Sequence, residues 1–198
     1  MANRDKVHNL LNDAIVEYNM NNLEINSCNQ MIRRTENQNR KLAKAYYAKS
    51  KSRMWALLGT ALSLVATGVF TIGAGISFWT VALAGVMCFQ TINLLKVHNE
   101  VKSLRREFAQ NNSMIRMYDR TKWFLEGYGQ FLENKRETLR YLYEQKQLTD
   151  EQISQKLAEI GLAEKQAEEL KELFVDDYEG TKQAIVMAEK QDEQQQEI

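Results

Sequence analysis

The feature that most constrains this chain is a run of 42 residues, 54–95, that contains no Lys, Arg, Asp or Glu. An apolar run of about 18 residues is long enough to span a membrane, and this one is roughly twice that length. Gly73 and Gly75 lie near its middle. Because every backbone N–H and C=O in hydrocarbon needs a partner within the chain, we expect two spanning helices, about 55–72 and 77–95, joined by a tight turn.

The alternative is a helical hairpin buried inside a soluble protein. Such a hairpin needs other parts of the chain to cover it, and a chain of 198 residues has too little remaining sequence to cover a run of this length. We therefore interpret residues 54–95 as a transmembrane hairpin and the chain as an integral membrane protein.

Basic residues flank both ends of the apolar run and predict its orientation. Six bases and no acid precede it within fifteen residues, and four bases with two acids follow it: Arg40, Lys41, Lys44, Lys49, Lys51, Arg53, Lys96, Glu100, Lys102, Arg105, Arg106 and Glu107. Basic flanks stay on the cytoplasmic side, so both termini are expected to be cytoplasmic. Trp55 and Trp79 are expected to anchor the two membrane interfaces. A secretory signal is not expected, because the run begins after about 50 polar residues.

Residues 1–53 and 96–147 are expected to form two helical arms. Along the first arm, side chains at spacings of four and three form a heptad pattern: Val7, Leu11, Ala14, Tyr18, Asn21, Ile25, Cys28, Ile32, Thr35, Asn39, Leu42 and Tyr46. A closed hairpin pairs residues whose numbers add up to about 149. This register places residues 37–39 opposite 110–112, and 19–22 opposite 127–129. The arms are therefore predicted to pair as an antiparallel coiled coil.

The remaining chain is predicted to form a helical head, 148–189, followed by a disordered tail, 190–198. Thr149 and Gln152 have capping-box spacing, Gly161 is expected to end the first helix, and 176–180 is expected to be a break. The expected head core is Trp123, Phe124, Phe131, Leu157, Leu170 and Phe174. This helix–Gly-Leu–helix layout is similar to that of short helical adaptor modules such as ubiquitin-associated domains. The predicted fold class is thus all-α: a transmembrane hairpin, coiled-coil arms and a small distal head.

Small side chains recur every four residues along each span. They are expected to form a helix-packing or oligomer interface: Gly59, Ser63, Thr67, Thr71 and Gly75 on the first span, and Thr80, Ala84 and Cys88 on the second. These stripes pack either on each other or on another subunit. Gln90 and Asn93 carry the amide side chains of the spans, and they are expected to form interhelix polar contacts or to line a pore.

The sequence offers no arrangement typical of a catalytic site. His8 and His98 lie far apart along the predicted arms, and there is no Walker or Rossmann glycine loop. Cys28 and Cys88 fall in an arm and in a span, so neither a disulfide nor a metal site is expected. We therefore expect no enzyme activity, cofactor or metal. Adjacent basic residues beside a membrane favour lipid headgroups over nucleic acid as partners.

Two functions fit these expectations. The first is a membrane-anchored coiled-coil scaffold or adaptor that is homo-oligomeric and presents its head to a cytoplasmic protein. The second is a subunit of an oligomeric pore; in layout, the chain is similar to two-span membrane-permeabilising effector proteins, although it carries no diagnostic motif. A hairpin that shapes one leaflet is a third reading, but spans long enough to cross completely argue against it.

Overall fold

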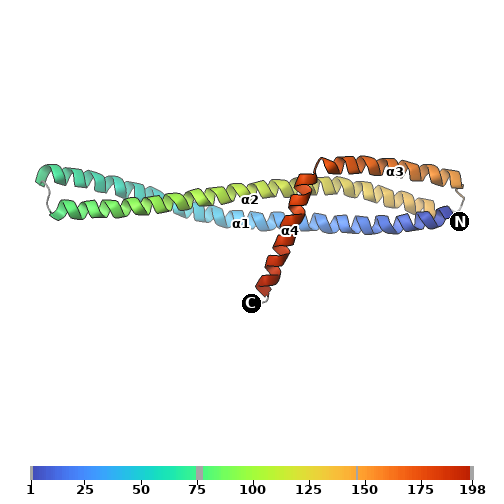
Figure 1. Ribbon diagram of the computed structural model, residues 1–198, viewed down its shortest axis with the longest axis horizontal. Helices are drawn as coiled ribbons and strands as arrows, with labels where there is room; N and C mark the ends of the chain where they lie inside the picture. Colours follow the sequence, from blue (N-terminus) through green and yellow to red (C-terminus); the bar gives the residue numbers. More distant parts are fainter. Residues whose placement is uncertain (1, 75–77, 146, 197–198) are drawn as a thin grey trace. The chain divides into compact units, whose positions relative to one another are not determined.

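The computed structural model describes residues 2–74, 78–145 and 147–196, and these residues form four α-helices and no strand. The helices are α1 (Ala2–Ala74), α2 (Phe78–Glu144), α3 (Asp150–Glu172) and α4 (Val175–Gln196), shown in Figure 1. The chain contains no proline, so neither long helix meets a residue that removes a backbone donor. The all-helical class expected from the sequence is confirmed for the described residues.

The chain divides into two compact units, which we describe separately. Unit 1 comprises Met1–Arg34 and Met114–Ile198, and unit 2 comprises Thr35–Ser113. These limits differ from the boundaries at residues 53 and 95 that the sequence predicts. The sequence boundaries mark the ends of the uncharged run, whereas the two units reflect which residues pack together. The added helices α3 and α4 belong to unit 1.

In unit 2, α1 and α2 run side by side in opposite directions (Figure 1). Three polar contacts join them: Asn39 Nδ2 to Asn112 Oδ1 at 2.9 Å, Lys49 Nζ to Glu100 Oε2 at 2.6 Å, and Ser63 Oγ to Gln90 Oε1 at 2.8 Å. In each pair the two residue numbers add up to a value close to 149, the sum expected for a closed hairpin. The predicted facing of 37–39 and 110–112 is therefore confirmed.

The distribution of side chains in the uncharged run of unit 2 is the reverse of that in a water-soluble hairpin. The polar Ser63 and Thr80 are buried there, whereas the buried Val97 and Val101 of unit 2 lie beyond the run. Its largest apolar side chains are exposed, among them Leu62, Val69, Phe70, Ile72, Phe78, Phe89 and Ile92. In both α1 and α2, only 6% of the most apolar 18-residue window is buried. Both helices are long and apolar enough to cross a membrane.

Unit 1 has a conventional apolar core shared by three helices. Val7 and Ala14 of α1 pack with Leu139 and Leu142 of α2 and with Ile153 of α3. A second cluster joins Cys28 to Phe124, Leu125 and Tyr178. The predicted capping box is confirmed, because the Thr149 side chain accepts from the Gln152 N–H and the Gln152 side chain accepts from the Thr149 N–H. This box begins α3 where it can reach the first cluster.

Three predicted helix boundaries in the C-terminal segment were wrong. Gly161 does not end a helix, since α3 continues to Glu172. An interior glycine costs only about 1 kcal/mol, and flanking Ala, Leu, Glu and Lys are strong helix formers. The break lies at 173–174 rather than 176–180, and residues 190–196, expected to be disordered, extend α4. Residues 197–198 lie outside the described residues. The continuous α3 also removes the likeness to a three-helix adaptor module.

Asn21 occupies a buried position between the helices of unit 1. Its Nδ2 donates to the Leu125 carbonyl at 2.9 Å, and a Cβ at Gly129 would lie 2.8 Å from that nitrogen. Gly129 therefore leaves the room that the buried amide occupies, which places 19–22 beside 127–129 as the register predicted. Gly127, two residues earlier in the same helix, differs: a Cβ at this position would meet no neighbouring atom within 4 Å.

These two glycines give a matched pair of substitutions in one helix. Gly127→Ala should stabilise the protein by up to about 1 kcal/mol, because alanine is the better helix former and meets no neighbour. Gly129→Ala should lower the free energy of unfolding by about 1 kcal/mol or more, because the methyl displaces a hydrogen-bonded buried amide. Chemical unfolding of the purified full chain in mild detergent measures both. Equal effects of the two substitutions would contradict the close approach at Gly129.

Candidate functional site

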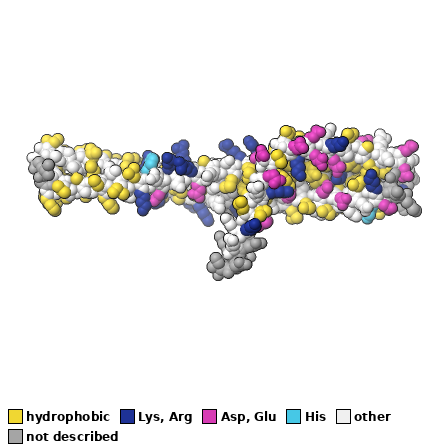
Figure 2. All heavy atoms as spheres, viewed as in Figure 1, with side chains coloured by type: hydrophobic (Ala, Val, Ile, Leu, Met, Phe, Trp, Pro, Cys, Tyr) yellow, Lys and Arg dark blue, Asp and Glu magenta, His cyan; other side chains and the backbone are white. Residues whose placement is uncertain are grey.

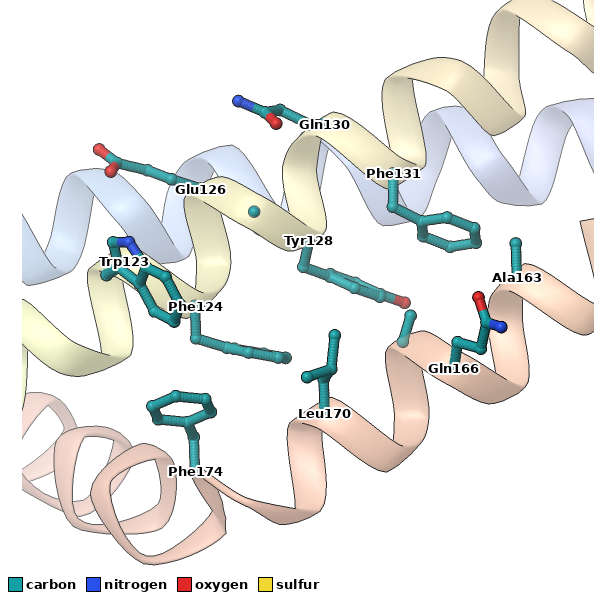
Figure 3. A pocket seen from close by; sticks show the side chains of 12 residues that line it. Trp123, Phe124, Glu126, Tyr128, Gln130, Phe131, Ala163, Gln166, Leu170 and Phe174 are labelled. Carbon is teal, nitrogen blue, oxygen red and sulfur yellow. The ribbon is translucent and has the colours of Figure 1, made fainter.

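An apolar groove of about 520 Å³ lies between α2 and α3 in unit 1 (Figure 3). Aromatic side chains of α2 form one wall, and α3 contributes Leu170 and two alanines, with Phe174 just beyond its end. The ring centroids are close: Trp123–Phe174 and Phe124–Phe174 are each 5.7 Å apart, and Tyr128–Phe131 are 5.8 Å apart. These distances are typical of interacting aromatic pairs. The wall of the groove is therefore formed by aromatic rings that pack against one another.

The groove exists because small residues stand opposite large ones. Ala163 and Ala167 on α3 face the rings of α2, and Gly127 on α2 carries no side chain at all. Residues at these spacings of three and four share one helix face, so the opening follows the helices. Glu126, Gln130 and Gln166 supply polar groups among the lining residues (Figure 3). An apolar floor with few polar groups at its edge is typical of a surface that binds another molecule.

The expected head core is only partly correct. Phe124 is buried, and Phe131, Leu157 and Phe174 are half-buried. Trp123 and Leu170 were predicted to be core residues, but their side chains are 67% and 54% exposed. The reason is that α3 packs on α2 along one face only, so the aromatic surface that the sequence shows on several faces of α2 is covered in part. These two exposed residues are among those that line the groove.

Tyr178 lines a smaller cavity of about 260 Å³, to which all four helices contribute residues. Its hydroxyl donates to Glu24, 2.9 Å from Oε2, and the Lys182 ammonium lies 4.4 Å from its ring centroid. Burial raises the pKa of Tyr178 above its usual value, so it remains a neutral donor. The Thr121 and Thr181 hydroxyls meet at 2.9 Å nearby. These contacts hold the start of α4 in place.

Lys135 joins all three long elements of unit 1. Its ammonium lies 3.1 Å from Glu17 on α1 and 2.5 Å from Glu164 on α3, and its side chain is 5% exposed. Burial lowers the pKa of Lys135, but the two carboxylates outweigh that effect and leave the pKa raised. This residue was not among those predicted from the sequence. The signal was its position in the series Leu132, Lys135, Leu139, whose spacing places a lysine on the packed face.

In unit 2 the small-residue stripes are only partly at the helix contact. Ser63 and Thr80 are buried, and Gly59, Thr67 and Ala84 are half-buried, whereas Thr71 and Cys88 are exposed. Gly75 lies outside the described residues. A strict four-residue spacing advances about 40° around the helix at each step, so the stripe leaves the partner after a few turns. Thr71 and Cys88 therefore do not pack between the two helices of the hairpin, and the alternative of packing on another subunit stays a prediction.

The two amides of the second span differ in environment. Gln90 accepts from Ser63 and lies beside Gly59, where a Cβ would be 3.5 Å from its side-chain amide. Gln90 thus makes the predicted interhelix contact, while Asn93 is exposed. Trp55 and Trp79 are also exposed, and their role as interface anchors stays a prediction. Among the described residues, no group of three or more His, Cys, Asp or Glu side chains is arranged to hold a metal ion.

The chain matches no protein-family model, and no curated protein and no solved structure is significantly similar to it. The geometry of the two units is therefore what supports the functional argument.

Cys28 in the second core cluster gives a pH-dependent test of that core. Burial, followed by the nearby Glu24 charge, raises the pKa of the Cys28 thiol from 9.0 to about 11. The unfolded thiol therefore ionises first as the pH rises. The stability that this difference contributes is complete below pH 9 and is lost as the pH approaches 11. Between these values the loss should be about 2 kcal/mol.

The measurement is the free energy of unfolding from pH 8 to pH 11 for the parent chain and two variants. Cys28→Ala should flatten the alkaline decline, whereas Cys88→Ala should leave it unchanged because Cys88 belongs to unit 2 and does not pack in the Cys28 cluster. The same decline in all three proteins would show that the Cys28 thiol does not contribute to it.

Proposed function

We propose that this chain is a membrane-anchored helical scaffold. In this proposal the hairpin of residues 54–95 lies in the bilayer, the flanking segments pair as a coiled coil, and unit 1 offers its groove to a cytoplasmic protein. The observation that carries the proposal is the outward-facing apolar surface of unit 2. Burying one large apolar side chain is worth about 1.5–3 kcal/mol, so a surface of many such side chains requires a cover.

Both helices of the hairpin contribute apolar side chains to this surface. Figure 2 shows apolar side chains spread over that end of unit 2, with Lys and Arg gathered where the uncharged run stops. A core helix of a soluble protein would be mostly buried, whereas here only 6% of each apolar window is buried. Lipid can cover this apolar surface without any contact from other parts of the chain.

The polar groups of the hairpin also suit a hydrocarbon environment. The hydroxyls of Thr60, Thr67, Thr71 and Thr91 each donate to a carbonyl four residues earlier in the same helix. Between the helices, the Ser63 hydroxyl donates to the side-chain carbonyl oxygen of Gln90. An unpaired polar group in hydrocarbon costs several kcal/mol, so pairing these groups internally favours insertion.

The scaffold role rests on the contrast between the two units. Unit 1 has its own apolar core, and the groove beside that core exposes Trp123 and Leu170. An exposed tryptophan beside a packed aromatic wall resembles the centre of a protein-binding surface. A partner segment with apolar side chains at helical spacing fits a groove between two helices.

One observation favours the second candidate, a subunit of an oligomeric pore. Asn93 exposes its amide within an otherwise apolar surface, where a polar group needs a partner or water. A second copy of the hairpin would provide either one. Gln90 does not support this candidate, because it is already bonded to Ser63.

Reconstitution into vesicles loaded with a fluorescent dye tests both candidates together. We expect the full chain to remain with the vesicles after an alkaline wash and the dye to remain inside. Leakage that Asn93→Leu abolishes would favour the pore, with Gln183→Leu on α4 as a control. Release of the chain into the wash would contradict membrane anchoring and with it both candidates.

A further inference from the structure

The basic residues of unit 2 form a collar around both helices next to the apolar run. Unit 2 contains ten Lys and Arg and three Glu, so its net charge is +7, and unit 1 consequently carries −7 in a chain of net charge zero. All ten bases fall in residues 40–53 and 96–106. We define these ten residues as the basic collar.

The pairing of the helices brings like charges to the same level. The Lys49–Glu100 contact at 2.6 Å fixes the register here, and it lowers the pKa of Glu100. In an antiparallel pair with this register, Arg53 and Lys96 share one level, and Lys44 and Arg105 share another. Within the described part of unit 2, the structure gives an ion pair for one residue of the basic collar, Lys49. Like charges at one level repel one another unless anions lie between or beside them.

We propose that the collar binds the headgroups of anionic phospholipids. This inference rests on the proposed membrane insertion, and it adds a preference for one class of lipid. The collar begins within two residues of Trp55 and one residue of Leu95, at the depth where headgroups lie. Charge complementarity identifies the ligand, because phosphate groups supply the negative charge that the surrounding side chains do not.

The inference predicts a graded effect of position. Lys51, Arg53 and Lys96 lie within about 6 Å of the apolar run along the helix axes. Arg40, Lys41 and Arg106 lie about 16–22 Å from it, beyond the screening length of about 8 Å. A base at an anionic surface strengthens the attraction about fivefold, and this gain disappears beyond the screening length. A role in orientation alone predicts no such gradient in lipid preference.

The experiment uses the full chain in vesicles of equal phosphatidylcholine and phosphatidylglycerol. After extraction in mild detergent, native mass spectrometry gives the ratio of the two lipids retained. With several bases at headgroup depth, we expect phosphatidylglycerol to exceed phosphatidylcholine about tenfold. Lys51→Gln/Arg53→Gln/Lys96→Gln should bring the ratio close to one, while Arg40→Gln/Lys41→Gln/Arg106→Gln, with the same change in charge, should retain most of it.

Two results would overturn the inference. One is equal retention of both lipids by the parent chain, and the other is an equal loss of preference in the two triple variants. A chain that inserts into pure phosphatidylcholine vesicles but shows no preference contradicts the collar alone. A chain that enters no vesicle contradicts the proposed function first, so the two failures can be distinguished.

Discussion

The exposure of large apolar side chains along the described part of the uncharged run, residues 54–95, is the constraint on which the other features depend. In water such a surface is unfavourable by tens of kcal/mol, so it must be covered. The inside of the hairpin meets the complementary requirement. Its small and polar residues let two helices approach and let the Ser63 hydroxyl donate to Gln90. The apolar run of unit 2 thus carries large apolar side chains outside and small or polar ones between its helices.

Unit 1 follows the opposite arrangement, with Val7, Leu139 and Ile153 inside and acidic residues on its surface. Figure 2 shows Asp and Glu gathered over this unit. A negatively charged unit is repelled by an anionic leaflet, while the basic collar is attracted to it. The proposed membrane anchor therefore agrees with the distribution of charge between the two units. The groove between α2 and α3 gives unit 1 a surface on which contact with a protein can form.

Periodicity in the sequence was sufficient to predict the helices and their pairing, because spacing of three and four residues reports which face is packed. It placed Asn39 opposite Asn112 and identified Thr149 as a cap. It could not predict the groove, which depends on where α3 stops contacting α2. Trp123 and Leu170 look like core residues by type, and only their neighbours show that they are exposed. Lys135 was missed because its role depends on Glu17 and Glu164, which lie more than 25 positions away along the chain.

The most direct test of the account is the environment of Cys88, which is exposed within the second apolar helix. In a Cys28→Ser variant reconstituted in vesicles, a nitroxide attached to Cys88 can be examined by electron paramagnetic resonance. The account predicts high accessibility to oxygen, which concentrates in hydrocarbon, and low accessibility to a water-soluble nickel chelate. The opposite pattern would place this face of the hairpin in water and contradict the central claim.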